Sequence, residues 1–133
     1  MLVAVADTHA LLWYMYDDDR LSTRVSELIN DAESAGNRIG FSVMSLIEVT
    51  YLQEKNRIPQ RTLTHIESTI SDPNTVLLEL PIDRLIAMSV EQVDRVQVPE
   101  LPDRVIAATA MVYRVPLLSR DGMITASDIH TIW

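Results

Sequence analysis

The sequence predicts an α/β fold, a three-layer α/β/α sandwich whose central parallel sheet has four to five strands. Short apolar runs alternate with helical stretches along the chain, which is the pattern of repeated strand-helix-strand units. The runs are apolar at consecutive positions, as expected of parallel strands covered on both faces. The 133 residues, 47% of them hydrophobic, suffice for one core. We therefore expect residues 1–133 to form a single domain.

The first part of the chain contains two expected strands with their helices. Residues 2–6 (LVAVA) predict a buried strand, and residues 8–16 predict a helix. Ser22 is a suitable N-cap for the next helix, which ends at Gly36. Residues 38–43 predict the second strand.

The middle of the chain continues the alternation. A helix is expected from residue 45 to about residue 55, because Ser45 and Glu48 match the S-x-x-E capping box. Residues 60–71 predict a further helix, and residues 76–80 predict a third buried strand.

The last part begins with a helix that Pro81 restarts. Its apolar face is expected to hold Ile82, Leu85, Ile86, Ser89, Val90 and Val93. Pro102 suits the first turn of the next helix, which runs to about Arg114 and is apolar nearly all round, so it is expected to be buried. Residues 116–119 and 131–133 predict the final strands.

Composition excludes several classes of protein. Nineteen acidic against eleven basic residues give a formal charge of −8, which disfavours non-specific DNA binding. The absence of cysteine excludes disulfides, thiolate zinc sites and cysteine nucleophiles. No apolar stretch approaches the ~20 residues of a membrane span, and the N-terminus does not look like a secretion signal. We expect no membrane association and a cytoplasmic location.

Four acidic residues are expected near the carboxyl edge of the sheet, where open parallel sheets bind ligands. They follow the first, second and fourth strands or begin the buried helix: Asp7, Glu48, Asp121 and Asp103. Each also has a local structural interpretation, as a helix cap, a capping-box residue, a turn residue or a partner of the helix dipole. Taken singly, most of the four acids fit these structural roles at least as well as they fit a role in ligand binding.

Together, four carboxylates at one edge repel one another, so a counter-charge is expected. Arg104 and Arg120 are adjacent in sequence to two of the acids and are one candidate. Mg²⁺ or Mn²⁺ is the more specific candidate for the counter-charge, since these ions prefer carboxylate oxygens and often bridge protein to phosphate.

The sequence resembles PIN domains, and more narrowly the VapC-type toxins of bacterial and archaeal toxin–antitoxin pairs. The resemblance covers essentially the whole chain and is carried by residues 7–13 (DTHALLW), 45–49 (SLIEV), 101–110 (LPDRVIAATA) and 117–121 (LLSRD). It implies a metal-dependent endoribonuclease that hydrolyses RNA with one or two Mg²⁺ or Mn²⁺ ions. By motif, the catalytic and metal-binding residues are Asp7, Glu48, Asp103 and Asp121, and Ser119 supports the metal site. It also implies a small cognate antitoxin and a homodimer.

Other residues and functions stay open. His9 and Arg104 are candidates for substrate contact, although a buried or capping role is the alternative for His9. Arg20, Arg24 and Arg57 are further candidates for phosphate contacts, and Asp128 is left outside the site. The alternative functions are a catalytically inactive PIN-like domain and a receiver-like domain that only bind a partner. A receiver needs a lysine late in the chain, whereas the only lysine is Lys55.

Overall fold

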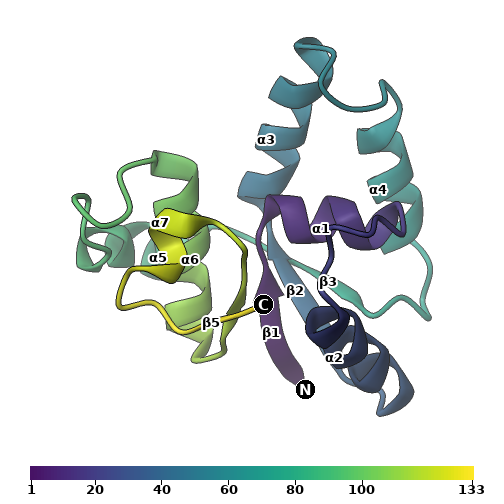
Figure 1. The fold of residues 1–133 in the computed structure, drawn as a ribbon, viewed down its shortest axis with the longest axis horizontal. Helices are drawn as coiled ribbons and strands as arrows, with labels where there is room; N and C mark the ends of the chain where they lie inside the picture. The colour runs from purple at the N-terminus through teal and green to yellow at the C-terminus, as the bar shows by residue number, and fades with distance from the viewer.

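The computed structural model describes residues 1–133 and confirms the three-layer α/β/α fold (Figure 1). The central sheet has five strands, all parallel, in the order β3-β2-β1-β4-β5. The strands are β1 (Leu2–Ala6), β2 (Arg38–Ser42), β3 (Leu77–Leu80), β4 (Leu117–Leu118) and β5 (Thr131–Ile132). All five lie inside the runs that predicted them.

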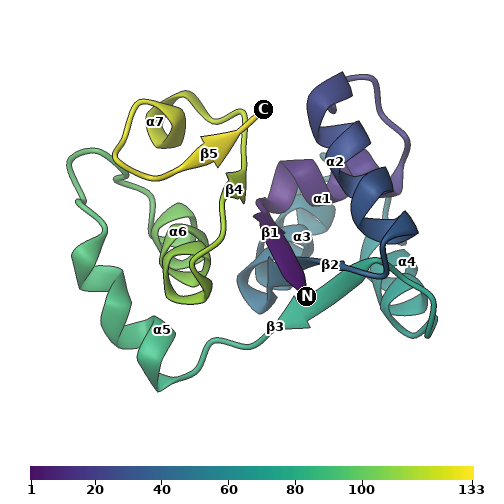
Figure 2. The ribbon, with the colours of Figure 1, turned by 90° about the horizontal axis from the view of Figure 1, so that it is seen from below.

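Helices cover both faces of the sheet (Figure 2). One face carries α1 (Thr8–Met15), α2 (Thr23–Ser34), α3 (Val43–Glu54) and α4 (Thr62–Ile70). The other carries α5 (Arg84–Ser89), the 3-10 turn η1 (Val90–Gln92), α6 (Leu101–Tyr113) and α7 (Gly122–Thr125). No helix has both the length and the apolar character needed to cross a membrane.

Neighbouring residues of the strands supply two separate cores, one under each helical layer. Ala4 and Ala6 of β1 pack beneath α1 to α4, whereas Val5 packs beneath α5 to α7. A Cβ atom on Gly40 of β2 would lie 2.6 Å from the Cδ1 atom of Leu80. A side chain at this position would therefore force the Leu80 side chain to shift within the second core.

The growth of the sheet reverses at β1, and this reversal positions the site. The chain builds β2 and β3 on one side of β1 and then crosses over to build β4 and β5 on the other. The amide of Asp7 donates a hydrogen bond to the carbonyl of Leu118 at 3.1 Å, which holds the ends of β1 and β4 side by side. At such a switch point the following loops separate and leave a crevice at the carboxyl ends of the strands.

The capping-box prediction for α3 is wrong. The helix begins at Val43, and its N-cap is Ser42, whose hydroxyl accepts a hydrogen bond from the Met44 amide at 3.0 Å. Because Ser42 at the end of β2 already supplies the cap, Ser45 lies inside the helix and is fully buried. Glu48 therefore lies in the second turn of α3, and its carboxylate contacts other elements.

The helix expected from Pro81 also starts later. It begins at Arg84, after the N-cap Asp83, whose carboxylate accepts a hydrogen bond from the Ile86 amide at 2.9 Å. Leu85, expected on the buried face, is 60% exposed. The reason is that only the Ile86 side of this short helix packs against α6.

Candidate active site at the carboxyl edge of the sheet

All four predicted acidic residues line one pocket of about 200 Å³ at the switch point. In Figure 1 the end of β1 lies between α1 and α3 on one side and α6 and α7 on the other. The pocket is lined by polar residues and one proline from these four helices and their N-caps: Asp7, Thr8, His9, Glu48, Glu100, Pro102, Asp103 and Asp121. Segments far apart in the sequence thus place their acids around one cavity.

Asp7 both caps a helix and lines the pocket. It directly follows β1, and its Oδ1 atom accepts a hydrogen bond from the Ala10 amide at 2.8 Å, which caps α1. The residue is only 6% exposed. Burial raises the pKa of Asp7 above its usual 3.8, while the Ser119 hydroxyl and the Ala10 amide act to lower it. The two interpretations of this residue are therefore compatible.

Glu48 is oriented by hydroxyl groups. Its Oε1 atom accepts a hydrogen bond from the Thr8 hydroxyl at 2.6 Å, and this hydroxyl lies 2.8 Å from that of Ser45. Burial raises the pKa of Glu48, and the Thr8 hydroxyl opposes the rise. The orienting roles of Thr8 and Ser45 did not emerge from the sequence, although both residues lie within the segments that carry the family resemblance.

Asp103 also has a raised pKa, and no hydrogen bond from the protein opposes the rise. It lies in the first turn of α6, and its side chain accepts no hydrogen bond from the protein. Burial, and after it the charges of neighbouring acids, together raise its pKa from 3.8 to about 7, with Asp121 and Glu48 the largest contributors among the acids. The negative charge of the acids in the pocket is therefore not balanced by a neighbouring cation.

Asp121 is held by the loop that follows β4. Its Oδ1 atom accepts hydrogen bonds from the amides of Met123 at 2.9 Å and Ile124 at 3.1 Å, so it caps α7. The fully buried Ser119 hydroxyl accepts a hydrogen bond from the Asp121 amide at 3.1 Å. Ser119 thus fixes the backbone of the loop that presents Asp121 to the pocket.

The donor set fits Mg²⁺ or Mn²⁺ in its chemistry. The candidate ligands are carboxylate oxygens, which these hard ions prefer, and a cation would relieve the repulsion that raises the pKa of Asp103. As the side chains lie, no three His, Asp or Glu residues are close enough together to hold an ion. Mg²⁺ is often held by only one or two carboxylates together with water molecules, and Asp103, whose side chain makes no hydrogen bond, is free to rotate toward an ion. Glu100, the N-cap residue of α6, is a fifth acid of the pocket that the sequence analysis did not identify.

A second hollow of about 350 Å³ adjoins the acid pocket and contains arginines. It shares Asp7, His9 and Asp121 with the acid pocket and adds Trp13, Arg20 and Arg120. The guanidinium carbon of Arg120 lies 4.5 Å from the centre of the Trp13 ring, and that of Arg20 lies 5.1 Å from it. These distances are typical of cation–π contacts.

Two other predicted arginines lie elsewhere. Arg104 donates hydrogen bonds to the carbonyls of Val93 at 2.9 and 3.2 Å and of Val90 at 3.0 Å. Its donors tie α6 to η1 and do not balance the acids. Arg24 lines a hollow beside α2 that contains none of the four predicted acids. The structure brings neither arginine into the acid pocket.

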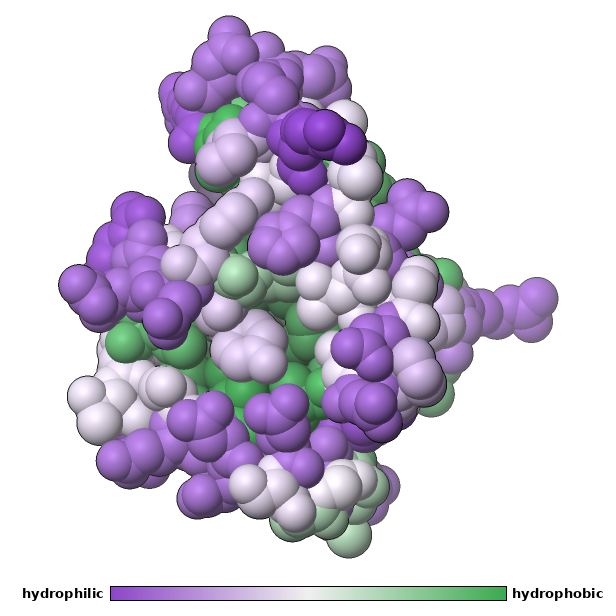
Figure 3. Space-filling model, turned by 90° about the vertical axis from the view of Figure 1, so that its right-hand side faces the viewer, coloured by the Kyte–Doolittle hydropathy of each residue, from purple (hydrophilic) through white to green (hydrophobic).

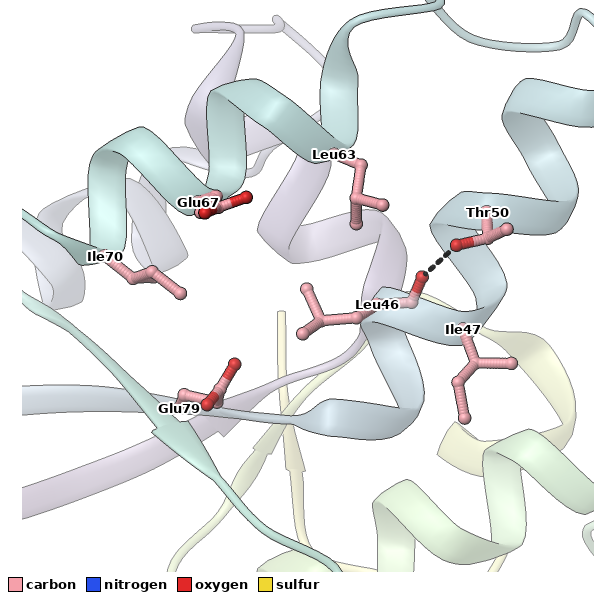
Figure 4. A pocket seen from close by; sticks show the side chains of 7 residues that line it. All are labelled: Leu46, Ile47, Thr50, Leu63, Glu67, Ile70 and Glu79. Atoms are coloured by element: carbon pink, nitrogen blue, oxygen red, sulfur yellow. Dashed lines mark hydrogen bonds between the residues drawn. The ribbon is translucent and has the colours of Figure 1, made fainter.

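A further pocket of about 330 Å³ lies away from the acids. It is formed by α3, α4 and β3, and Figure 4 shows its lining of Leu46, Ile47, Thr50, Leu63, Glu67, Ile70 and Glu79. The side of the molecule shown in Figure 3 exposes hydrophobic side chains between hydrophilic ones. The pocket in Figure 4 is mainly apolar, and none of the four predicted acids lines it.

Comparison with known proteins identifies relatives of this fold. The family model described as PIN domain matches residues 4–128. VapBC2 from Rickettsia felis, solved with a DNA fragment from its promoter, is 12% identical with a TM-score of 0.72, covering 99% of each chain. DNA-bound VapBC from Salmonella typhimurium is 21% identical with a TM-score of 0.70, covering 99% of this chain and 98% of that one. A toxin–antitoxin complex from Klebsiella pneumoniae is 18% identical with a TM-score of 0.62, covering 98% of this chain and 96% of that one. A comparison with curated protein sequences finds no match.

Proposed function

The chain belongs to the PIN domain family, and from this membership and the acid pocket we propose that it is a Mg²⁺- or Mn²⁺-dependent endoribonuclease, the toxin of a type II toxin–antitoxin pair. The observation that carries the proposal is the convergence of Asp7, Glu48, Asp103 and Asp121 at the switch point of the sheet. The likeness to solved VapBC complexes supports the toxin assignment.

The four carboxylates would hold the divalent ion. Asp7 and Asp121 are fixed by backbone amides at the starts of α1 and α7, so they form the rigid part of the site. Asp103 makes no competing hydrogen bond, so its carboxylate would be free to ligate the ion. The chemistry supplied by bound Mg²⁺ or Mn²⁺ is activation of a water molecule and stabilisation of charge on the leaving oxygen of a phosphodiester.

The pocket offers no free side-chain nucleophile. Thr8 has the one alcohol among the lining residues, and its hydroxyl is engaged by Glu48 and Ser45. Water is therefore the nucleophile, and Thr8 has a positioning role, because it fixes the carboxylate of Glu48. Ser119 has a similar role toward the loop of Asp121.

The proposed partner is a small antitoxin that places a basic residue near the acids. The formal charge of −8 and the raised pKa of Asp103 both favour a cationic group from a partner in this pocket. The homodimer stays a prediction.

The proposal is tested by Mn²⁺-dependent cleavage of purified RNA. Asp7→Asn, Asp103→Asn and Asp121→Asn each remove a charge at nearly constant volume, so we expect each to abolish cleavage while the far-ultraviolet circular dichroism stays unchanged. Asp128→Asn is the matched control, because Asp128 is exposed and lies outside the pocket. Cleavage by all three site variants at the wild-type rate would refute the proposal, and a folded wild-type protein that cuts no RNA would favour the inactive, partner-binding alternative.

A further inference from the structure

We propose that single-stranded RNA enters the acid pocket along one groove, whose phosphate contacts are Arg120, Arg20 and Arg57. This inference rests on the proposed function, and it adds the form of the substrate and the side from which it arrives. We call this surface the arginine groove.

The groove is continuous with the acid pocket. His9 lines the acid pocket, the adjoining hollow of about 350 Å³ and a third hollow of about 410 Å³. Trp13 and Arg20 line both of the last two, and Arg57 lines the third. The surface thus runs without interruption from the acids, across α1, to the loop between α3 and α4.

Cations are concentrated on this side of the acids. Arg120 is exposed and makes no ion pair or side-chain hydrogen bond, so all of its N–H groups are free for phosphate. Arg20 is held by Asp18 at 2.8 Å, which orients its guanidinium group beside Trp13. Arg57 is exposed, and its side chain also has no partner.

The other walls of the acid pocket repel phosphate. No arginine or lysine lines that pocket, and Glu100 adds a further acid at the start of α6. A polyanion therefore has a favourable approach only past Arg120. Because Arg104 and Arg24 lie elsewhere, the structure selects among the arginines that the sequence left open.

The rings in the groove favour an unpaired strand. His9 is exposed, and its ring centre lies 5.5 Å from that of Trp13. Unpaired bases stack on such rings, whereas the bases of a duplex are already stacked on each other. Trp13 itself is only 7% exposed and is covered by Arg20, Arg120 and Trp133. Trp13 therefore positions the arginines, and His9 is the ring available to a base.

The test removes groove cations one at a time and measures binding. Arg120→Gln and Arg57→Gln are compared with Arg84→Gln, which removes an exposed arginine from α5 in the opposite helical layer. All three are made in the Asp103→Asn background so that RNA is not cut. The affinity for a fluorescein-labelled single-stranded RNA is measured by fluorescence anisotropy over a series of salt concentrations.

We expect each groove variant to lower the slope of log affinity against log salt by about 0.7, the value for one lost phosphate contact on a single strand. Arg120→Lys should restore the slope, and Arg84→Gln should leave it unchanged. With Asp103 intact, Arg120→Gln should raise KM for single-stranded RNA several-fold and leave kcat nearly unchanged. A duplex of the same sequence should bind several-fold more weakly than the single strand.

The outcomes separate this inference from the proposed function. If the wild type cuts RNA but the groove variants bind RNA as Arg84→Gln does, and with Asp103 intact also cut it as Arg84→Gln does, the arginine groove is wrong and the nuclease assignment stands. If the wild type cuts no RNA, the nuclease assignment fails, and the salt slopes still decide whether the groove binds a strand. Equal affinity for duplex and single strand would overturn the single-strand assignment.

Discussion

Asp103→Asn is expected to make the metal-free protein more stable while abolishing its activity. The Asp103 carboxyl group is partly buried beside four other acids, and its pKa is raised from 3.8 to about 7. Ionisation of this group at neutral pH therefore destabilises the folded protein relative to the unfolded chain. Asparagine has nearly the same volume and carries no charge, so it removes the repulsion without leaving a cavity.

The size of the effect follows from the change in pKa. A pKa raised from 3.8 to about 7 corresponds to roughly 4 kcal/mol at 1.36 kcal/mol per pH unit. Because the side chain is only half-buried, screening by solvent reduces this, and we expect about 2 kcal/mol at pH 8. For a domain of this size that is a rise in Tm of roughly 5–10 °C. Since the folded pKa lies above the unfolded one, the wild type is not destabilised below about pH 4 and loses stability as the pH rises to about 7.

The assay is thermal unfolding followed by circular dichroism in EDTA at several pH values. The Tm difference between Asp103→Asn and wild type should grow from pH 4 to pH 7 and stay constant above it. Asp128→Asn, which removes an exposed acid outside the pocket, should show no such growth. Addition of Mn²⁺ should stabilise the wild type more than Asp103→Asn. Equal Tm values for the two proteins at pH 8 in EDTA would refute the electrostatic reasoning.

Two further predictions concern residues that position others. Thr8→Val removes the hydroxyl that donates a hydrogen bond to Glu48 at 2.6 Å, so the pKa of Glu48 should rise further. The acidic limb of the pH profile of kcat/KM should then move to higher pH. An unmoved limb would show that this hydrogen bond does not control the ionisation of Glu48. Arg104→Met removes the hydrogen bonds to the carbonyls of Val90 and Val93. The free energy of unfolding in urea titrations should fall by about 1.5–3 kcal/mol, while kcat/KM of the folded protein should stay unchanged. A loss of cleavage without a loss of stability would instead place Arg104 in the active site.

Local patterns were a good guide to the fold. The strands lie inside the apolar runs that predicted them, because a buried parallel strand needs only a few consecutive apolar residues. Helix starts were less predictable. Both Ser42 and Ser45 are suitable caps by residue type, and the end of β2 selects Ser42. The start near Pro81 was likewise shifted to the residue after Asp83, which provides a better side-chain cap.

The sequence by itself determined the α/β class, the strand positions and the four acids that follow strands or begin a helix, since these depend on residues close together in the chain. Tertiary structure alone decided the strand order, the reversal at β1 and the partners of each side chain. Thr8 and Glu48 are 40 residues apart, and the bond between them forms only once β1 and β2 lie side by side. In the same way, Arg120 faces the groove while Arg104 binds backbone carbonyls. A charged residue next to an acid in sequence can point to either side of its element, and the packing of neighbouring elements selects the side.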